Sequence, residues 1–328
     1  STTATTQTDM LNEKFTKNKK PARQKSNRRP EPTATNGVLR KRKAALKVST
    51  VDVGAGSAGF DPLDISGCYF WFRADQISGP SNGDNITSSH TVPNEGASGA
   101  FSHSSTSSEQ PTYTASAINS QPAITFDGAT EYIELDSAAS WGELFDVTEL
   151  ESDYTVMIVC RPHDVSDNSQ RIFGMYATTN FGSVPGSGVN NVLWMGIKNN
   201  SKFSICGKHS GTDEVQAAAA ISDNEAHIFT AVYDHSETKM FLFQDGHLSA
   251  SDSSWAGGER HAGDVKLGCA TASGRGGTTY SDKFDGDIAE ILIYDSKMSE
   301  KNLTKLHHYL GSKYAISTKS GRKSISRY

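Results

Sequence analysis

The chain lacks any long hydrophobic run. No stretch of about 18 consecutive apolar residues occurs, so we expect no segment to insert into a membrane. The N-terminus begins at Ser1 and lacks the apolar core of a secretory signal. We therefore expect a protein made in a cytoplasm and not secreted.

Apolar residues are scarce overall. They make up 35% of the 328 residues, which is low for a globular chain of this length. The four cysteines, Cys68, Cys160, Cys206 and Cys269, include no Cys-x-x-Cys pair. Without secretion, we expect reduced thiols that are buried as small hydrophobic groups.

Charge is distributed unevenly along the chain. Residues 1–50 carry 13 Lys and Arg against 3 Asp and Glu, and residues 317–328 carry 4 basic residues and no acidic one. The net charge of −5 for the whole chain leaves −5 − 10 − 4 = −19 for residues 51–316. We expect a basic arm and hinge at 1–60, a folded acidic domain at 61–316, and a basic tail at 317–328.

The basic arm has too few apolar residues to fold alone, so we expect it to be disordered without a partner. A solvated tail, a localisation signal and nonspecific nucleic-acid contact are alternative interpretations of its charge. A further interpretation is an arm that anchors the protein to other subunits of an assembly. The candidate assembly contacts are Phe15, Lys17, Lys19, Lys20, Arg28, Arg29, Leu39, Arg40, Lys41, Arg42 and Lys43.

The acidic domain has the pattern of many short strands. Val156–Cys160 is a short apolar run that Arg161-Pro162 ends. Segments 191–197 and 202–206 predict one strand pair, and 227–233 with 239–244 predict a hairpin, with Asp245-Gly246 as the next turn. The last strands are expected at 265–268 and 287–294. This pattern favours a β-sandwich or jelly roll.

One helix is expected near the C-terminus. Ser299 is a suitable N-cap, and Leu303, Leu306, His307 and Leu310 follow at helical spacing. Gly311 is expected to end this helix. Its leucines should pack on the sandwich.

Three ordered passages resemble a known family. They are 67–75, which contains Phe70-Trp-Phe-Arg-Ala-Asp75; 110–128, which contains Gln110-Pro-Thr-Tyr113 and Phe126-Asp-Gly128; and 284–314, which contains Phe284-Asp-Gly-Asp-Ile-Ala-Glu290. Together they are similar to the laminin-G-like, concanavalin A-like jelly roll found in bacterial and phage virion proteins. The resemblance implies an all-β jelly-roll sandwich with one C-terminal helix over residues 61–316. Ser120 stands where the family pattern has Gly, and 87–99 lacks the family's Trp.

The acidic strand 285–290 has the spacing of the catalytic carboxylates in concanavalin A-like glucanases. If this strand were catalytic, Asp285 would be the nucleophile, Asp287 its electrostatic partner and Glu290 the general acid. The alternative, which we favour, is a structural strand with carboxylates at its edge, because the fold alone does not imply catalysis.

Other candidate sites are weaker. No cofactor is expected. Oxygen-rich loops at 164–168, 213–214, 223–225 and 282–287 are alternatives for calcium, although solvated loops are favoured. Candidate glycan contacts are aromatic residues in or near Gly- and Ser-rich loops, with packing over the core as the alternative: Trp141, Tyr176, Phe181, Trp255 and Tyr280.

The sequence therefore favours a non-enzymatic structural component of a large assembly. The resemblance points to a phage virion, as a head decoration or a tail or fibre protein, with a lectin-like domain displayed by the basic arm. A carbohydrate-binding module that recognises a surface glycan is the main alternative, and a glycan hydrolase is a third.

Overall fold

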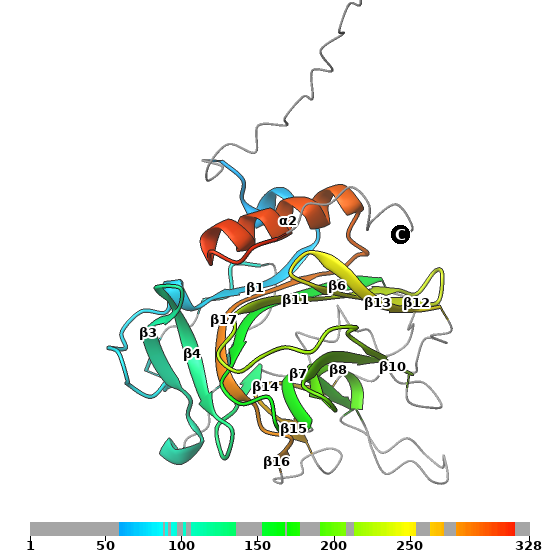
Figure 1. Ribbon diagram of the computed structural model, residues 1–328. Coiled ribbons are helices and arrows are strands. Elements are labelled where there is room, and N and C mark those ends of the chain that lie inside the picture. Colours follow the sequence, from blue (N-terminus) through cyan, green and yellow to red (C-terminus); the bar gives the residue numbers. More distant parts are fainter. Residues whose placement is uncertain are drawn as a thin grey trace, which may run out of the picture. The chain divides into compact units, whose positions relative to one another are not determined.

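Two antiparallel β-sheets and one α-helix dominate a computed structural model of the chain (Figure 1). The chain divides into two units, Ser1–Asp52 and Val53–Tyr328. The structure describes only residues of the second unit: 59–87, 89–90, 93–96, 101–102, 106–135, 153–167, 169–177, 191–207, 213–253, 263–271 and 280–318. None of the described helices is long and apolar enough to cross a membrane.

The larger sheet has eight strands in the order β13-β12-β11-β6-β17-β4-β3, with β1 also paired to β17. Strand β17 pairs with β4 through its first half and with β1 through its second half, so both lie on the side of β17 that faces away from β6. Its strands are β1 (Cys68–Arg73), β3 (Thr112–Ile118), β4 (Gln121–Asp127), β6 (Tyr154–Pro162), β11 (His227–Asp234), β12 (Lys239–Gln244), β13 (His247–Asp252) and β17 (Asp285–Tyr294).

The smaller sheet has seven strands in the order β10-β9-β8-β7-β14-β5-β2. Its strands are β2 (Phe101–Ser102), β5 (Ile133–Leu135), β7 (Ser169–Ala177), β8 (Asn191–Lys198), β9 (Lys202–Gly207), β10 (Asp213–Gln216) and β14 (Gly263–Leu267). A separate two-stranded ribbon joins β15 (Ala270–Thr271) and β16 (Tyr280–Ser281). Short 3-10 turns occur at η1 (Pro62–Asp64), η2 (Ala74–Gln76) and η3 (Ser107–Glu109).

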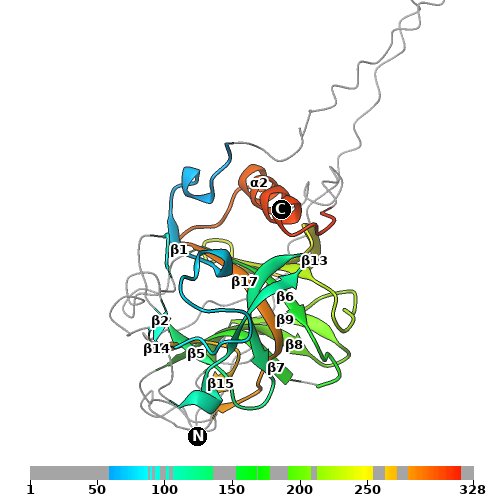
Figure 2. The ribbon, with the colours of Figure 1, turned by 90° about the vertical axis from the view of Figure 1, so that its left-hand side faces the viewer.

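Hydrophobic side chains fill two separate layers. The first layer lies between the two sheets and contains Phe70, Ile158 and Phe229. The second layer lies between the outer face of the eight-stranded sheet and helix α2 (Glu300–Lys313), which Figure 2 shows lying over that sheet. Alternating side chains therefore face one layer or the other, which confirms the expected all-β jelly roll with one C-terminal helix.

Strand and hairpin positions match most of the sequence expectations. The pairs β8–β9 and β11–β12 form as predicted. Asp245 and Gly246 have φ of 51° and 79°, so they form the turn between β12 and β13. Asn119 and Ser120 have φ of 48° and 70° between β3 and β4, so Ser120 adopts the left-handed conformation where the family pattern has Gly.

The expected end of the helix at Gly311 is wrong. Ser299 caps the N-terminus as predicted, but α2 continues to Lys313 and Tyr314 is its C-cap. The left-handed residue is Ala315, with φ of 50°, and the Ile316 amide donates to the Gly311 carbonyl at 2.9 Å. Gly311 is present for another reason: a Cβ there would lie 2.8 Å from the Ile316 carbonyl oxygen of the returning chain.

All four cysteines are buried and none forms a disulfide, which agrees with the sequence expectation. Burial raises the pKa of the Cys68 thiol to about 12 and that of the Cys269 thiol to about 12. These two thiols therefore stay protonated and act as small apolar groups.

Candidate functional site

The three carboxylates of β17 all belong to one strand but form two separate clusters. A regular strand would place Asp287 and Glu290 on opposite faces because they are three residues apart. A β-bulge between Ile288 and Glu290 changes the phase, so both carboxylates face the α2 side of the sheet. The strand is central in its sheet, between β6 and β4, so its carboxylates are not at a sheet edge.

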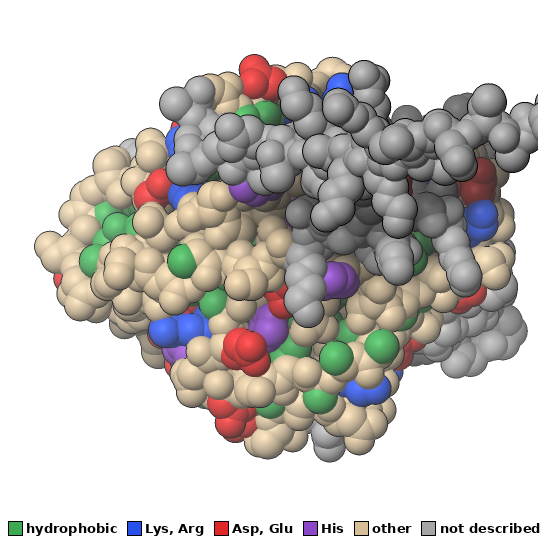
Figure 3. Space-filling model, turned by 45° about the horizontal axis from the view of Figure 1, so that its top comes forward, with side chains coloured by type: hydrophobic (Ala, Val, Ile, Leu, Met, Phe, Trp, Pro, Cys, Tyr) green, Lys and Arg blue, Asp and Glu red, His purple; other side chains and the backbone are tan. Residues whose placement is uncertain are grey.

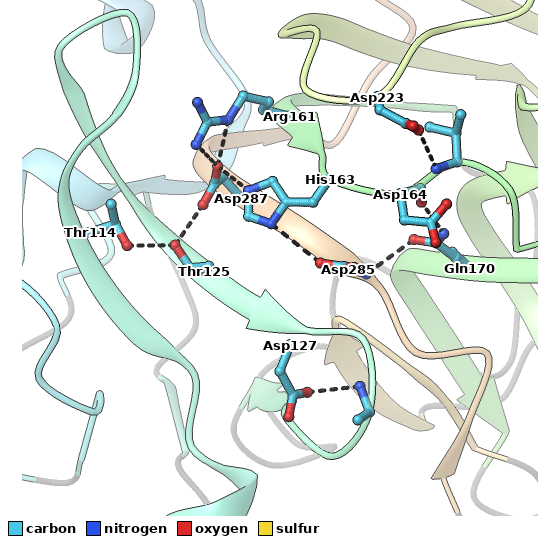
Figure 4. Close-up of polar contacts among 12 residues, drawn as sticks. Thr114, Thr125, Asp127, Arg161, His163, Asp164, Gln170, Asp223, Asp285 and Asp287 are labelled. Atoms are coloured by element: carbon cyan, nitrogen blue, oxygen red, sulfur yellow. Dashed lines mark hydrogen bonds and ion pairs between the residues drawn. The ribbon is translucent and has the colours of Figure 1, made fainter.

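Asp287 is the centre of the first cluster, which Figure 4 shows. Its side chain is fully buried. The Arg161 guanidinium contacts Asp287 Oδ2 through Nε at 2.8 Å and Nη2 at 2.6 Å, and the Thr125 hydroxyl donates to Oδ1 at 2.6 Å. Burial alone would raise the pKa of Asp287, but hydrogen bonds from His163 and Thr125 and the charges of His163 and Arg161 lower it. These contacts therefore favour the ionised form of Asp287.

His163 connects Asp287 to Asp285. Its Nε2 lies 2.9 Å from Asp287 Oδ2, and its Nδ1 lies 3.3 Å from Asp285 Oδ1. The hydrogen bond to Asp287 raises the pKa of His163, while burial raises the pKa of Asp285. The Gln170 side chain accepts the Asp285 amide at 3.1 Å, so the start of β17 is fixed against β7.

Glu290 is the centre of the second cluster. Its side chain is fully buried. Trp71 Nε1 donates to it at 2.8 Å, Lys313 Nζ at 2.8 Å and the Tyr314 hydroxyl at 2.9 Å. This carboxylate therefore fastens β1 and the end of α2 to the sheet.

These contacts do not fit the hypothesis that the β17 carboxylates catalyse glycoside hydrolysis. A glycosidase needs a proton-donating carboxylic acid and a second carboxylate on both sides of one open substrate cleft. Glu290, the candidate acid, is enclosed by Trp71, Lys313 and Tyr314, and Asp285, the candidate nucleophile, pairs with His163 in the separate cluster around Asp287. Neither side chain lines the pocket described next.

A pocket of about 400 Å³ lies beside the first cluster. Segments far apart in the sequence meet there: the β3–β4 turn, the end of β6, the approach to β11, the β12–β13 turn and the chain after α2. Ile118, Ala226 and Ile316 contribute apolar surface. The polar side chains that line it are Asn119, Arg161, Asn224, Glu225, Asp245 and Ser317.

Hydrogen bonds from outside the pocket hold its walls. Asn119 Nδ2 donates to the Tyr314 carbonyl at 2.6 Å, and Asp245 accepts the Ile228 amide at 2.8 Å while contacting His227 Nδ1 at 2.8 Å. Arg161 is held by Asp287 and keeps 28% of its side-chain surface exposed. The pocket is therefore formed before any ligand arrives.

The surface around α2 has no broad apolar patch in its described part. Figure 3 shows acidic, basic, histidine and hydrophobic side chains scattered among other polar atoms. Leu63, at 47% exposure, is the large hydrophobic residue exposed among those described.

The sequence matches a known family model over residues 127–304, a span that covers more than half of the chain. That model describes the concanavalin A-like lectin/glucanases superfamily. The chain belongs to this superfamily. No curated protein matches the sequence significantly.

Several solved structures resemble this superfamily member. A carbohydrate-binding module of the Ruminococcus gnavus IT-sialidase, bound to α2,3-sialyllactose, has 18% identity and a TM-score of 0.44, over 56% of this chain and 95% of the module. Domain 4 of the Geobacillus stearothermophilus arabinanase AbnA, in complex with arabinotriose, has 14% identity and a TM-score of 0.44, over 64% and 87%. The binding domain of Paraclostridial Mosquitocidal Protein 1 has 12% identity and a TM-score of 0.48, over 75% and 52%.

Nothing in the described part of this concanavalin A-like domain tests the aromatic residues that the sequence suggested as glycan contacts. Tyr176 lies on β7 and Tyr280 on β16, and the structure describes only their backbone. Trp141, Phe181 and Trp255 lie outside the described residues, as do all the candidate assembly contacts of residues 1–50.

The sequence patterns also did not identify Arg161, Asn224 and Asp245 as pocket residues. They predicted only that a strand ends at Arg161 and that Asp245 lies in a turn. The candidate calcium loops have protein partners where they are described: Asp223 accepts the Val165 amide at 2.8 Å, and Asp282 pairs with Arg171 at 3.3 Å. Among the residues described, no group of three or more His, Cys, Asp or Glu side chains is placed to hold a metal ion.

Proposed function

We propose that the protein is a non-enzymatic, lectin-like protein whose jelly-roll domain binds a glycan in the pocket beside Arg161. The observation that carries this proposal is the pocket itself, where amide, carboxylate, guanidinium and hydroxyl groups converge on about 400 Å³ of space. Sugars present many hydroxyl groups, which both donate and accept hydrogen bonds. A preformed pocket of planar polar side chains with small apolar surfaces suits such a ligand.

The state of the β17 carboxylates supports binding without cleavage. Asp287 and Glu290 already have their hydrogen-bond partners within the protein and do not line the pocket. Glu225 and Asp245 do line it, but Asp245 is engaged by the Ile228 amide and His227. The pocket carboxylates therefore accept hydrogen bonds from sugar hydroxyls.

A glycan array tests the binding proposal. The full chain should retain a restricted set of oligosaccharides, and the array should include sialyllactose, arabinotriose and neutral oligosaccharides. Bound oligosaccharides should be recovered intact after prolonged incubation, as judged by mass spectrometry. A folded chain that retains no glycan would contradict binding, and cleavage products would contradict the non-enzymatic assignment.

A second proposal concerns the basic N-terminal segment, which we infer anchors the domain in a larger assembly. The change from +10 over residues 1–50 to −19 over residues 51–316 supports it, because these two parts of the chain suit different partners. A phage virion is the assembly we propose, with the jelly roll displayed outward. Acidic protein surfaces or nucleic acid would neutralise the basic clusters.

Deletion of residues 1–50 tests the anchoring proposal. Incorporation into the assembly should be lost, while the truncated chain should keep the glycan profile of the full chain. A variant with Arg40, Lys41, Arg42 and Lys43 changed to Ala should lose part of the incorporation and become less sensitive to salt. Unchanged incorporation of the deleted chain would overturn the proposal.

A further inference from the structure

The pocket beside Arg161 presents more negative than positive charge. Among the described residues that line it, Arg161 is the one cation, whereas Glu225 and Asp245 are both acidic. Glu225 keeps 59% of its side-chain surface exposed, and Asp245 keeps 20%. A ligand that enters the pocket therefore meets both carboxylates.

The positive charge of Arg161 is already offset within the protein. Its Nε and Nη2 lie 2.8 Å and 2.6 Å from Oδ2 of the buried Asp287 (Figure 4). His163 also contacts Asp287, but it has a second carboxylate in Asp285 at 3.3 Å. Two cations at most thus face two carboxylates in this cluster, so it leaves no surplus positive charge to balance the acidic lining of the pocket.

The two lining carboxylates flank one buried imidazole ring. Asp245 Oδ2 lies 2.8 Å from His227 Nδ1, whereas Glu225 Oε2 is 3.8 Å from His227 Nε2, which is too far for a hydrogen bond. A single imidazole carries at most one positive charge, so it cannot balance both carboxylates. Because the two carboxylates lie at either end of one ring, their negative charges act together on the pocket.

The turn before β11 holds Glu225 where a ligand can reach it. The Asn224 amide donates to the Pro162 carbonyl at 2.7 Å, and the Asp223 side chain accepts the Val165 amide at 2.8 Å. Within the described part of the chain, the approach to the imidazole is the one contact of the Glu225 side chain. This carboxylate is therefore exposed to solvent on a backbone held at two points, unlike the enclosed carboxylates of β17.

We propose that the pocket beside Arg161 selects amino sugars whose amine is free and protonated. The ammonium group donates to Glu225, the charge of Asp245 adds to its attraction, and the other polar side chains of the lining face the sugar hydroxyls. Charge-assisted hydrogen bonds are stronger than neutral ones, so an ammonium group gains more at Glu225 than a hydroxyl does. The assignment of the ligand as a sugar rests on the proposed function, and the charge of the lining names the class of sugar.

Two forms of chitotriose test this selectivity, because they differ only at nitrogen: the deacetylated form has a free amine on every sugar and the acetylated form has none. In titration calorimetry of the full chain at about pH 6, where such amines are protonated, the deacetylated form should bind about tenfold or more tightly. Glu225→Gln should bring the two affinities within about threefold of each other. Glu237→Gln removes a carboxylate of similar exposure, 55%, from the β11–β12 turn and should leave their ratio unchanged.

Other outcomes would overturn the proposal in distinct ways. Equal binding of the two forms, weakened alike by Ser317→Trp, would keep the sugar pocket and overturn its selectivity, as would binding of neither form by a chain that retains other glycans on the array. Equal effects of Glu237→Gln and Glu225→Gln would show attraction to acidic surface in general. Trilysine that binds as tightly as deacetylated chitotriose would show a cation site without a sugar requirement. A folded chain that retains no glycan at all would remove the proposed function itself.

Discussion

Asp287 links four segments through one buried carboxylate. Thr125 comes from β4, Arg161 from β6 and His163 from the loop after β6, and Asp287 itself comes from β17. A buried carboxylate is stable only when its oxygens are fully hydrogen-bonded or paired with cations. The cluster therefore holds Arg161 in the position from which it lines the pocket.

Replacement of Asp287 by Asn should destabilise the domain. The substitution keeps the shape but leaves Arg161 without its anion and His163 with only Asp285, so we expect a loss of roughly 3 kcal/mol in the free energy of unfolding. The pKa of His163 should fall, because the hydrogen bond to Asp287 is the largest cause of its elevation. Chemical denaturation and NMR titration of His163 measure the two effects. Asp285→Asn is the matched control, and an equal loss of stability from it would contradict the central role of Asp287.

His163 and His307 should affect stability with opposite dependence on pH. The pKa of His163 is raised, so its contribution is complete below about 6.5, the usual value, and is lost as pH rises through the folded value. Burial lowers the pKa of His307 to about 4. Its contribution is therefore present above about 6.5 and is lost as pH falls from there towards 4.

His307→Gln should reduce the acid sensitivity of the domain. Glutamine can keep a hydrogen bond to Thr230, whose hydroxyl lies 3.0 Å from His307 Nε2, but it does not titrate. Between pH 7 and pH 5 the unaltered chain should lose about 2 kcal/mol more unfolding free energy than the variant. Urea denaturation at the two pH values measures this difference. Parallel losses in both chains would show that His307 does not carry the effect.

Among the secondary-structure elements, the sequence patterns predicted the strands more accurately than the end of helix α2. The apolar run at 156–160 and the hairpin at 227–244 were predictable because each is local. The sequence analysis wrongly predicted that the helix ends at Gly311, because a glycine near a helix terminus can serve two structural purposes. It can adopt the left-handed conformation, or it can let another segment approach closely, and only the fold shows that Ile316 returns over it.

Gly311→Ala tests the second use. Alanine favours a helix over glycine by about 1 kcal/mol, but its Cβ would lie 2.8 Å from the Ile316 backbone oxygen. We expect the contact to prevail and the variant to lose about 1 kcal/mol of unfolding free energy. Ser312→Ala, at the exposed neighbouring position, should be neutral or slightly stabilising. Thermal unfolding of both variants measures the comparison, and a more stable Gly311→Ala would contradict the close approach.

The candidate site could not be predicted from the sequence in the same way. Asn119, Arg161, Asn224, Asp245 and Ser317 come from five segments, and no local pattern relates them. The carboxylate spacing of β17 was visible, but the bulge that places Asp287 and Glu290 on one face was not. Burial then decides their role, since each carboxylate has its partners inside the protein.

For the whole molecule, membership of the superfamily defines the fold but does not identify the ligand. The concanavalin A-like model covers residues 127–304, and the family name includes both lectins and glucanases. The pocket beside Arg161 and the enclosed carboxylates support the proposed sugar binding, and the charge change near residue 50 supports the proposed anchoring by the basic segment.

Calorimetric titration tests whether the pocket beside Arg161 binds sugar. An oligosaccharide selected on the array is titrated into the unaltered chain and into two tryptophan variants. Ser317 is exposed and lines the pocket, whereas Ser312 is exposed on the same part of the chain and does not line it. Ser317→Trp should weaken binding by about tenfold or more, equivalent to about 1.4 kcal/mol, while Ser312→Trp should leave the affinity unchanged. Equal affinity in the unaltered chain and Ser317→Trp would contradict the assignment of this pocket as the sugar site.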